Sequence, residues 1–179
     1  SLYAEAPGED IPTYEQYQAG HRDKQIVPRE ATVFVGATEY TRKNSAEIIY
    51  KSTADPAMTP YDPEYKLLNT LSWTKPGNEI SYVLNVKQDG LYRLGFHYMN
   101  DKEEFSSFES IRIDGEVPFR ELACYAFPYS DSGWANEVLS DEEGNPYYIY
   151  LTAGEHTLTL KTEMEPVMPA WRYGQLIAE

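Results

Sequence analysis

Trp134 is the strongest candidate for a binding residue, because polar and small residues surround it in the run Tyr129-Ser130-Asp131-Ser132-Gly133-Trp134-Ala135-Asn136-Glu137. This run lacks the apolar–polar alternation of a strand, so we expect it to form a loop. An aromatic ring on a loop can stack on the C–H face of a sugar, while planar polar groups beside it bind the hydroxyls. Trp134, Tyr129 and Asn136 could therefore form a carbohydrate site. Alternatively, Trp134 packs the loop onto the edge of the domain.

Other loop residues could complete such a site. Trp171 lies in the run Pro169-Ala170-Trp171-Arg172-Tyr173, where it could serve as a second aromatic platform or as a plug of the core. Tyr125 could flank Trp134, and Asn100 is a plausible hydroxyl partner. Trp73 precedes the turn Lys75-Pro76-Gly77, and we expect it to pack in the core or on a sheet face and not to bind a ligand.

Residues suited to catalysis do not form a recognisable pattern. The three histidines, His21, His97 and His156, have no metal-ligand spacing, and no nucleophile elbow of the form Gly-x-Ser-x-Gly is present. Cys124 is the only cysteine, which excludes an internal disulfide and a thiolate zinc cluster. We therefore expect a protein that is not an enzyme. An esterase or lyase on a similar scaffold would need a cluster of histidines or acids in a cleft.

The charge of the chain limits its partners. Its 179 residues carry 29 acidic and 15 basic side chains, for a net charge of −14. A nucleic-acid binder needs clustered cations to neutralise phosphates, so we expect no nucleic-acid partner. No segment approaches the roughly 20 apolar residues of a membrane span, so we expect no membrane insertion.

Most of the chain after residue 30 alternates with a period of two, which indicates β-strands. The clearest case is Glu79–Val86, where Ile80, Tyr82, Leu84 and Val86 share one face. Further strands are expected over residues 32–36, 46–50, 91–99, 109–113 (with a possible continuation over 117–122), 147–151, 157–162 and 173–178. About nine short strands joined by turns predict an all-β, jelly-roll β-sandwich.

Turn signals and prolines predict how these strands are connected. Gln88-Asp89-Gly90 should form a turn that joins residues 79–86 and 91–99 in an antiparallel hairpin, and Asp114-Gly115 should form another turn. The prolines between Ser52 and Leu68 predict a loop. Residues 1–30 are polar and read as a leader or linker arm packing on the domain, with the sandwich over residues 31–179. Tyr14 to Asp23 could form a short helix or an extended arm.

Several segments resemble, in the same order, the galactose-binding-like carbohydrate-binding modules, especially families 6 and 35. The central one, Trp73 to Asn100, reads WTKPGNEISYVLNVKQDGLYRLGFHYMN and is similar to a hairpin of these modules. The others are VGATEYT (Val35 to Thr41), SIRIDGEVPF (Ser110 to Phe119) and YLTAGEHTLTL (Tyr150 to Leu160). The combination of IDGEVPF, AGEHTLTL and the nearby Glu165-Pro166 also resembles domains in secreted multidomain and solute-binding proteins of gut Firmicutes.

The resemblance implies a structural calcium ion, and at this point the chain departs from the family pattern. Glu39 matches an acidic ligand of the opening strand, whereas the preceding glutamate of the motif is replaced by Val35 or Gly36. The closing strand has Arg172 near the place of an acidic ligand. Calcium prefers six to eight oxygen ligands, so the calcium site is doubtful.

Together the residues and the resemblance predict a non-catalytic carbohydrate-binding module. Loop aromatics and polar side chains, namely Trp134, Tyr129, Asn136, Trp171 and Asn100, would attach a larger extracellular or cell-surface bacterial protein to an oligosaccharide or polysaccharide. The fold itself hosts many functions. The alternative is therefore an architectural or protein-interaction domain of a multidomain extracellular protein.

Overall fold

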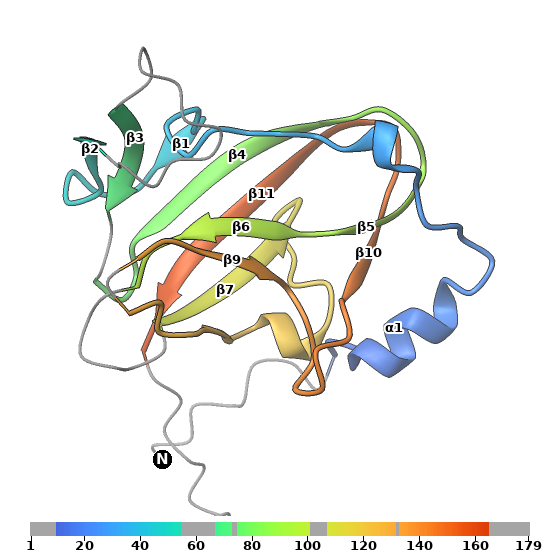
Figure 1. The fold of residues 1–179 in the computed structure, drawn as a ribbon. Helices are drawn as coiled ribbons and strands as arrows, with labels where there is room; N and C mark the ends of the chain where they lie inside the picture. The colour runs from blue at the N-terminus through green and yellow to red at the C-terminus, as the bar shows by residue number, and fades with distance from the viewer. Residues whose placement is uncertain (1–9, 55–66, 73–74, 101–106, 132, 165–179) are drawn as a thin grey trace, which may run out of the picture.

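The fold is an all-β sandwich, seen in a computed structural model that describes residues 10–54, 67–72, 75–100, 107–131 and 133–164 (Figure 1). Its larger layer is a five-stranded antiparallel sheet. The strands of this sheet, in spatial order, are β1 (Arg42–Lys43), β4 (Glu79–Val86), β11 (Gly154–Glu163), β7 (Ser107–Ile113) and β8 (Tyr125–Phe127). The alternating burial along β4 matches its sequence pattern, because one face of the strand packs inward.

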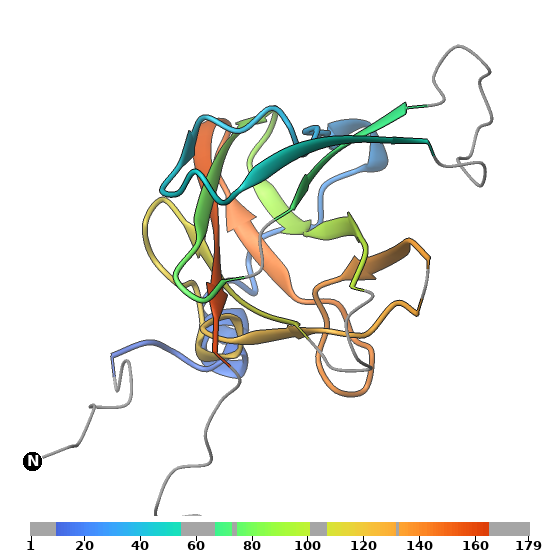
Figure 2. The same ribbon diagram turned by 90° about the vertical axis from the view of Figure 1, so that its left-hand side faces the viewer.

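The second layer is built on two consecutive strands, β5 (Gly90–Arg93) and β6 (Gly95–Tyr98). β5 pairs with β10 (Tyr148–Leu151), and β6 pairs with β9 (Ala135–Val138), both antiparallel. Between the two pairs, the Leu94 carbonyl accepts a hydrogen bond from the Leu139 N–H at 2.9 Å. The two pairs therefore form one continuous layer. Figure 2 shows β4 and β11 on one side of the molecule and β6 and β9 on the other.

Smaller elements surround the two layers. The pair β2 (Ile49–Ala54) and β3 (Leu67–Ser72) forms an antiparallel ribbon. The helix α1 (Tyr14–Gly20) precedes the described strands, and Thr13 and Gln16 form a capping box at its start. Two short 3₁₀ helices are η1 (Arg29–Ala31) and η2 (Arg120–Leu122). Among the described residues, no helix is both long and apolar enough to span a membrane.

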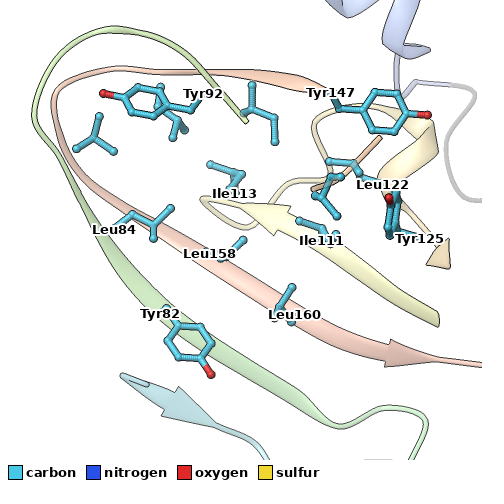
Figure 3. Packing of buried hydrophobic residues seen from close by; sticks show 14 of the residues in the cluster. Tyr82, Leu84, Tyr92, Ile111, Ile113, Leu122, Tyr125, Tyr147, Leu158 and Leu160 are labelled. Atoms are coloured by element: carbon cyan, nitrogen blue, oxygen red, sulfur yellow. The ribbon is translucent and has the colours of Figure 1, made fainter. Parts of the chain in front are cut away.

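The core lies between the layers and is formed by the inward faces of their strands. Figure 3 shows Leu84, Leu158 and Ile113 of the five-stranded sheet on one side of it. Tyr92 of β5 and Tyr147, next to β10, contribute from the other layer. Tyr82 is buried with its ring in the core, and its hydroxyl donates to the Ala37 carbonyl at 2.7 Å. The face of residues 79–86 that the sequence predicted, formed by Ile80, Tyr82, Leu84 and Val86, is the buried face of β4.

The hairpin predicted between residues 79–86 and 91–99 is wrong. β4 pairs with β1 and β11, whereas β5 pairs with β10. The turn before Gly90 therefore carries the chain from one layer to the other. Both strands alternate in the same way because each packs one face on the same core, so periodicity alone could not separate the two arrangements.

Three other strand predictions are changed by the structure. Residues 32–36 contain no strand; Phe34 in this segment is 88% exposed. The strand expected at residues 46–50 begins only at Ile49 and continues to Ala54, into the region predicted as a loop. Residues 117–122 turn into η2 instead of extending β7. The closing strand predicted at residues 173–178 lies outside the described residues.

Candidate binding site on strands β6 and β9

Strands β6 and β9 place a histidine and an asparagine side by side on the outer face of the second layer. His97 pairs with Asn136 in the antiparallel register, and both are exposed. Their neighbours Phe96 and Tyr98 lie on the opposite face, where each packs edge-on against Phe127, with ring centroids at 5.5 and 5.3 Å. The alternation of the strand thus directs two aromatic rings inward and His97 outward.

Trp134 directly precedes β9 and stacks on His97. The two ring centroids are 5.1 Å apart and the ring planes differ by 11°. The indole is half-buried, so it neither lies in the core nor projects freely into solvent. His97 therefore fixes the orientation of the indole plane, and a ligand can contact the part that remains exposed.

Asn136 fixes the other side of His97. The Nδ1 atom of His97 lies 2.9 Å from the Oδ1 atom of Asn136. Because an amide oxygen only accepts, His97 Nδ1 donates this hydrogen bond. Among the described residues, the Asn136 side-chain nitrogen has no hydrogen-bond partner, which leaves two N–H groups that can bind a ligand hydroxyl.

Hydrogen bonds of backbone and side-chain groups join the two loops beside this pair. Ser130 N–H donates to the Asn100 carbonyl at 2.9 Å, and Asn100 N–H donates to Ser130 Oγ at 2.7 Å. Tyr98 hydroxyl also donates to the Pro128 carbonyl at 2.8 Å. Tyr129, which lies between these contacts, is half-buried and donates its hydroxyl to Asp131 Oδ1 at 3.3 Å.

These contacts bring four of the five predicted sugar-binding residues to one end of the β6–β9 pair: Trp134, Asn136, Tyr129 and Asn100. The fifth, Trp171, lies outside the described residues, as does Trp73. His97 was missed, because its alternating strand suggested a structural role and the sequence does not show which strand pairs with it. Its place opposite Asn136 follows only from the register.

Tyr125 does not flank Trp134 as the sequence suggested. It is buried, and its hydroxyl donates to Glu137 Oε1 at 2.6 Å and accepts from the Ser140 N–H at 3.0 Å. Burial raises the pKa of Tyr125 well above its usual range, and the hydrogen bond to Glu137 raises it further. Tyr125 therefore supports β9 from the inner face, opposite Asn136.

Glu39 lies in a tight turn of its own. Its Oε2 atom accepts a hydrogen bond from the Gly36 N–H at 2.7 Å, and its N–H donates to the Gly36 carbonyl at 2.9 Å. Within the described part of the chain, no group of three or more acidic, histidine or cysteine side chains is placed to hold a metal ion. Glu39 is therefore not part of such a group among the described residues, and the segment containing Arg172 lies outside them.

Solved structures of carbohydrate-binding modules share this arrangement of strands. A family 35 module from Clostridium thermocellum matches with a TM-score of 0.54 and 14% identity, over 75% of this chain and 87% of the module. A module (CBM6cm-2) from Cellvibrio mixtus lichenase 5A, in complex with cellotriose, matches with a TM-score of 0.51 and 14% identity. The match covers 74% of this chain and 87% of that module.

The chain has the β-sandwich fold of these modules. No protein-family model and no curated protein matches it, so the likeness rests on structure. The fold class and the similarity to families 6 and 35 expected from the sequence are confirmed. The module fold leaves the ligand open, since identities of 14% carry no information on individual binding residues.

Proposed function

We propose that this chain is a non-catalytic carbohydrate-binding module whose sugar site lies on the outer end of the β6–β9 pair. The observation that carries the proposal is the near-parallel stack of Trp134 on His97 beside the exposed Asn136 amide. A pyranose would pack its C–H face on the exposed part of the indole. The Asn136 amide and the polar loop around Asn100 and Tyr129 would bind its hydroxyls.

The rigidity of this site favours binding. The His97 stack and hydrogen bond hold the Trp134 plane and the Asn136 amide in place before a ligand arrives. A site that is already ordered loses less conformational entropy when it binds. The half-buried, open platform also suits weak and reversible attachment better than enclosure of a substrate.

We further propose that the module belongs to a larger secreted or cell-surface bacterial protein, such as those of gut Firmicutes, and keeps it close to a glycan. The acidic surface, with a net charge of −14, suits a soluble extracellular module. The similar module from Cellvibrio mixtus is itself a part of a lichenase. A structural calcium ion is a separate proposal, which titrations with and without calcium would test.

The second candidate function is that of an architectural or protein-interaction domain. One observation favours it: Phe34 is 88% exposed and offers an apolar contact for another domain. In that case Trp134 would have no sugar ligand.

Isothermal titration against a panel of neutral oligosaccharides, with wild type beside Trp134→Ala, tests the sugar proposal. Removing an aromatic anchor commonly costs about 2 kcal/mol, so we expect a roughly 30-fold weaker affinity. Phe34→Ala is the matched control, since it removes an exposed aromatic from another segment and should leave the affinity unchanged. No binding by the wild type across the panel, with and without calcium, would favour the architectural function.

A further inference from the structure

A hollow lies on the outer face of the β5–β10 pair, where the segment from α1 to residue 27 crosses this face. On β10, Ile149 and Leu151 are buried in the core, so Tyr148 and Tyr150 occupy the outer face. Helix α1 lies beside β10 (Figure 1) and is joined to it by two hydrogen bonds. The Tyr148 N–H donates to the Tyr14 hydroxyl at 3.0 Å, and the Tyr150 N–H donates to the Tyr17 hydroxyl at 2.9 Å.

The other wall of the hollow lies along β5. Leu91 N–H donates to the Gln25 carbonyl at 2.8 Å, and Val27 N–H donates to the Leu91 carbonyl at 3.2 Å. The segment therefore runs from one edge of the β5–β10 pair to the other. We call the resulting hollow the α1 groove. It is lined by residues of α1, by Leu91 and Tyr148, and by five residues of the segment that follows α1, namely His21, Arg22, Lys24, Gln25 and Ile26. Its volume of about 420 Å³ is within the range of small-molecule sites.

Aromatic and aliphatic side chains form most of the α1 groove. Tyr14, Tyr17 and Tyr148 line it, and Ile26 is 60% exposed at its margin. Tyr17 is held by the imidazole of His21, with the ring centroids 4.3 Å apart. The groove thus offers ordered, largely apolar ring surfaces on which the C–H face of a sugar ring can pack.

Besides the His21 imidazole and the tyrosine hydroxyls, the polar groups that line the groove are cations and amides. Arg22, Lys24, Gln18 and Gln25 line it, and none of its lining residues is acidic. This is unusual in a chain with almost twice as many acidic as basic residues. Lys24 already has partners for its charge: its Nζ atom forms a salt bridge with Asp23 Oδ2 at 3.3 Å and lies over the Tyr150 ring, 4.9 Å from the centroid. Arg22 is exposed and has no hydrogen-bond or ion-pair partner among the described residues.

We propose that the α1 groove is a second saccharide site that takes an anionic pyranose, one bearing a carboxylate or a sulfate group. The sugar ring packs on the tyrosines, and the planar guanidinium of Arg22 binds the anionic group with two parallel hydrogen bonds. The amides of Gln18 and Gln25 bind hydroxyls. This site shares no residue with the Trp134 platform, so neither proposal depends on the other.

Chemical-shift mapping on the ¹⁵N-labelled chain tests the proposal with glucuronic acid, glucose 6-sulfate and glucose as probes. We expect at least one of the two anionic sugars to shift amides of residues 17–26 and 148–150, and to bind at least about tenfold more tightly than glucose. Which anionic probe binds more tightly tells carboxylate from sulfate. No shift in these amides with either anionic sugar, or equal binding of glucose there, would overturn the proposal.

Arg22→Gln is the decisive variant, and Arg29→Gln is its control, because Arg29 is an exposed arginine that does not line the groove. Arg22→Gln should weaken binding of the anionic sugar about tenfold, whereas Arg29→Gln and Trp134→Ala should not. An unchanged affinity in Arg22→Gln would contradict the assignment. Failure of neutral sugars to bind at Trp134 would leave this result intact, so the two proposals fail separately.

Discussion

His156 joins two turns at one end of the five-stranded sheet. Its Nδ1 atom lies 2.6 Å from Asp114 Oδ2, and its Nε2 atom lies 2.8 Å from the Thr152 carbonyl oxygen. Both ring nitrogens thus face acceptors, which suits the protonated imidazolium. The hydrogen bond to Asp114 raises the pKa of His156, and it outweighs partial burial, which lowers it. Partial burial raises the pKa of Asp114, but hydrogen bonds from Thr157 and His156 lower it overall.

The stability of the protein should therefore depend on pH through this pair. The stabilisation that His156 contributes is complete below about pH 6.5, the pKa of an unfolded histidine. It is lost as the pH rises through the raised pKa of His156 in the folded state. The stabilisation that Asp114 contributes is present above about pH 4 and is lost as the pH falls through the lowered pKa of Asp114. The side chain of Asp114 is half exposed, so screening limits the effect to about 1 kcal/mol or less.

Urea unfolding at pH 5.5 and pH 8.5 checks this prediction. The wild type should lose more unfolding free energy between the two pH values than His156→Asn, since the variant lacks the titrating group. Any pH-dependent contribution from the rest of the chain is common to both proteins and cancels in the difference. The same pH dependence in wild type and variant would show that the pair does not contribute.

At residue scale, the sequence identified the type of site but not all of its members. Trp134 and Asn136 stand out because small and polar residues surround them. His97 could not be recognised, because it lies in an alternating run whose partner strand is distant in sequence. Tyr125 looks like a loop aromatic in the sequence but is buried beneath β9, because the local sequence does not show that β9 covers it.

Among the elements, α1 has a specific role at the edge of the second layer. Its tyrosine hydroxyls accept hydrogen bonds from two N–H groups of β10 that point away from β5. An unpaired strand edge is prone to pairing with other chains, and covering it with a helix is one protection. Burial raises the pKa of Tyr17, so its hydroxyl stays neutral at physiological pH and can both accept and donate.

Tyr17→Phe should expose this edge. The substitution removes the acceptor of the Tyr150 N–H, and we expect a loss of about 1 kcal/mol in the free energy of unfolding. Hydrogen exchange should accelerate at the Tyr150 amide more than at amides of β4. Tyr40→Phe is the control, since no hydrogen bond of the Tyr40 hydroxyl is seen among the described residues. An unchanged exchange rate at Tyr150 would contradict the role assigned to α1.

At element scale, periodicity was sufficient to predict a strand where one face packs on the core, as in residues 79–86. It did not predict which strands pair, because residues 79–86 and 91–99 alternate alike but belong to different layers. It also failed at residues 32–36, where Val33 and Val35 would share one face of a strand but the described structure forms none. Strand pairing depends on tertiary contacts that a local pattern does not contain.

Over the whole molecule, residues 10–31 are joined to the sandwich at several points. Gly90 is a key position, because a Cβ atom there would lie 2.5 Å from Val27 Cγ1 and 2.9 Å from the Gln25 carbonyl oxygen. Only a glycine lets β5 and the N-terminal segment approach this closely. The domain boundary predicted at residue 30 remains a prediction, but the packing makes β5 and residues 25–27 neighbours.

Gly90→Ala should therefore displace residues 25–27 from β5. Steric overlap of this kind typically costs about 1–3 kcal/mol of unfolding free energy. We expect a lower melting temperature, together with faster hydrogen exchange at Val27 and Leu91. Gly133→Ala is the control, since within the described part of the chain no atom beyond its sequence neighbours lies within 4 Å of its added Cβ. Equal melting temperatures for the two variants would contradict the close approach.

The central claim is that this fold binds a sugar on the outer end of the β6–β9 pair. Mapping amide shifts of the ¹⁵N-labelled chain with the neutral oligosaccharide that binds most tightly is the most direct test. The account predicts shifts at His97, Trp134 and Asn136 and at the loops of Asn100 and Tyr129, and their loss in Trp134→Ala. Saturable shifts confined to another face of the sandwich, or none with any oligosaccharide, would contradict it.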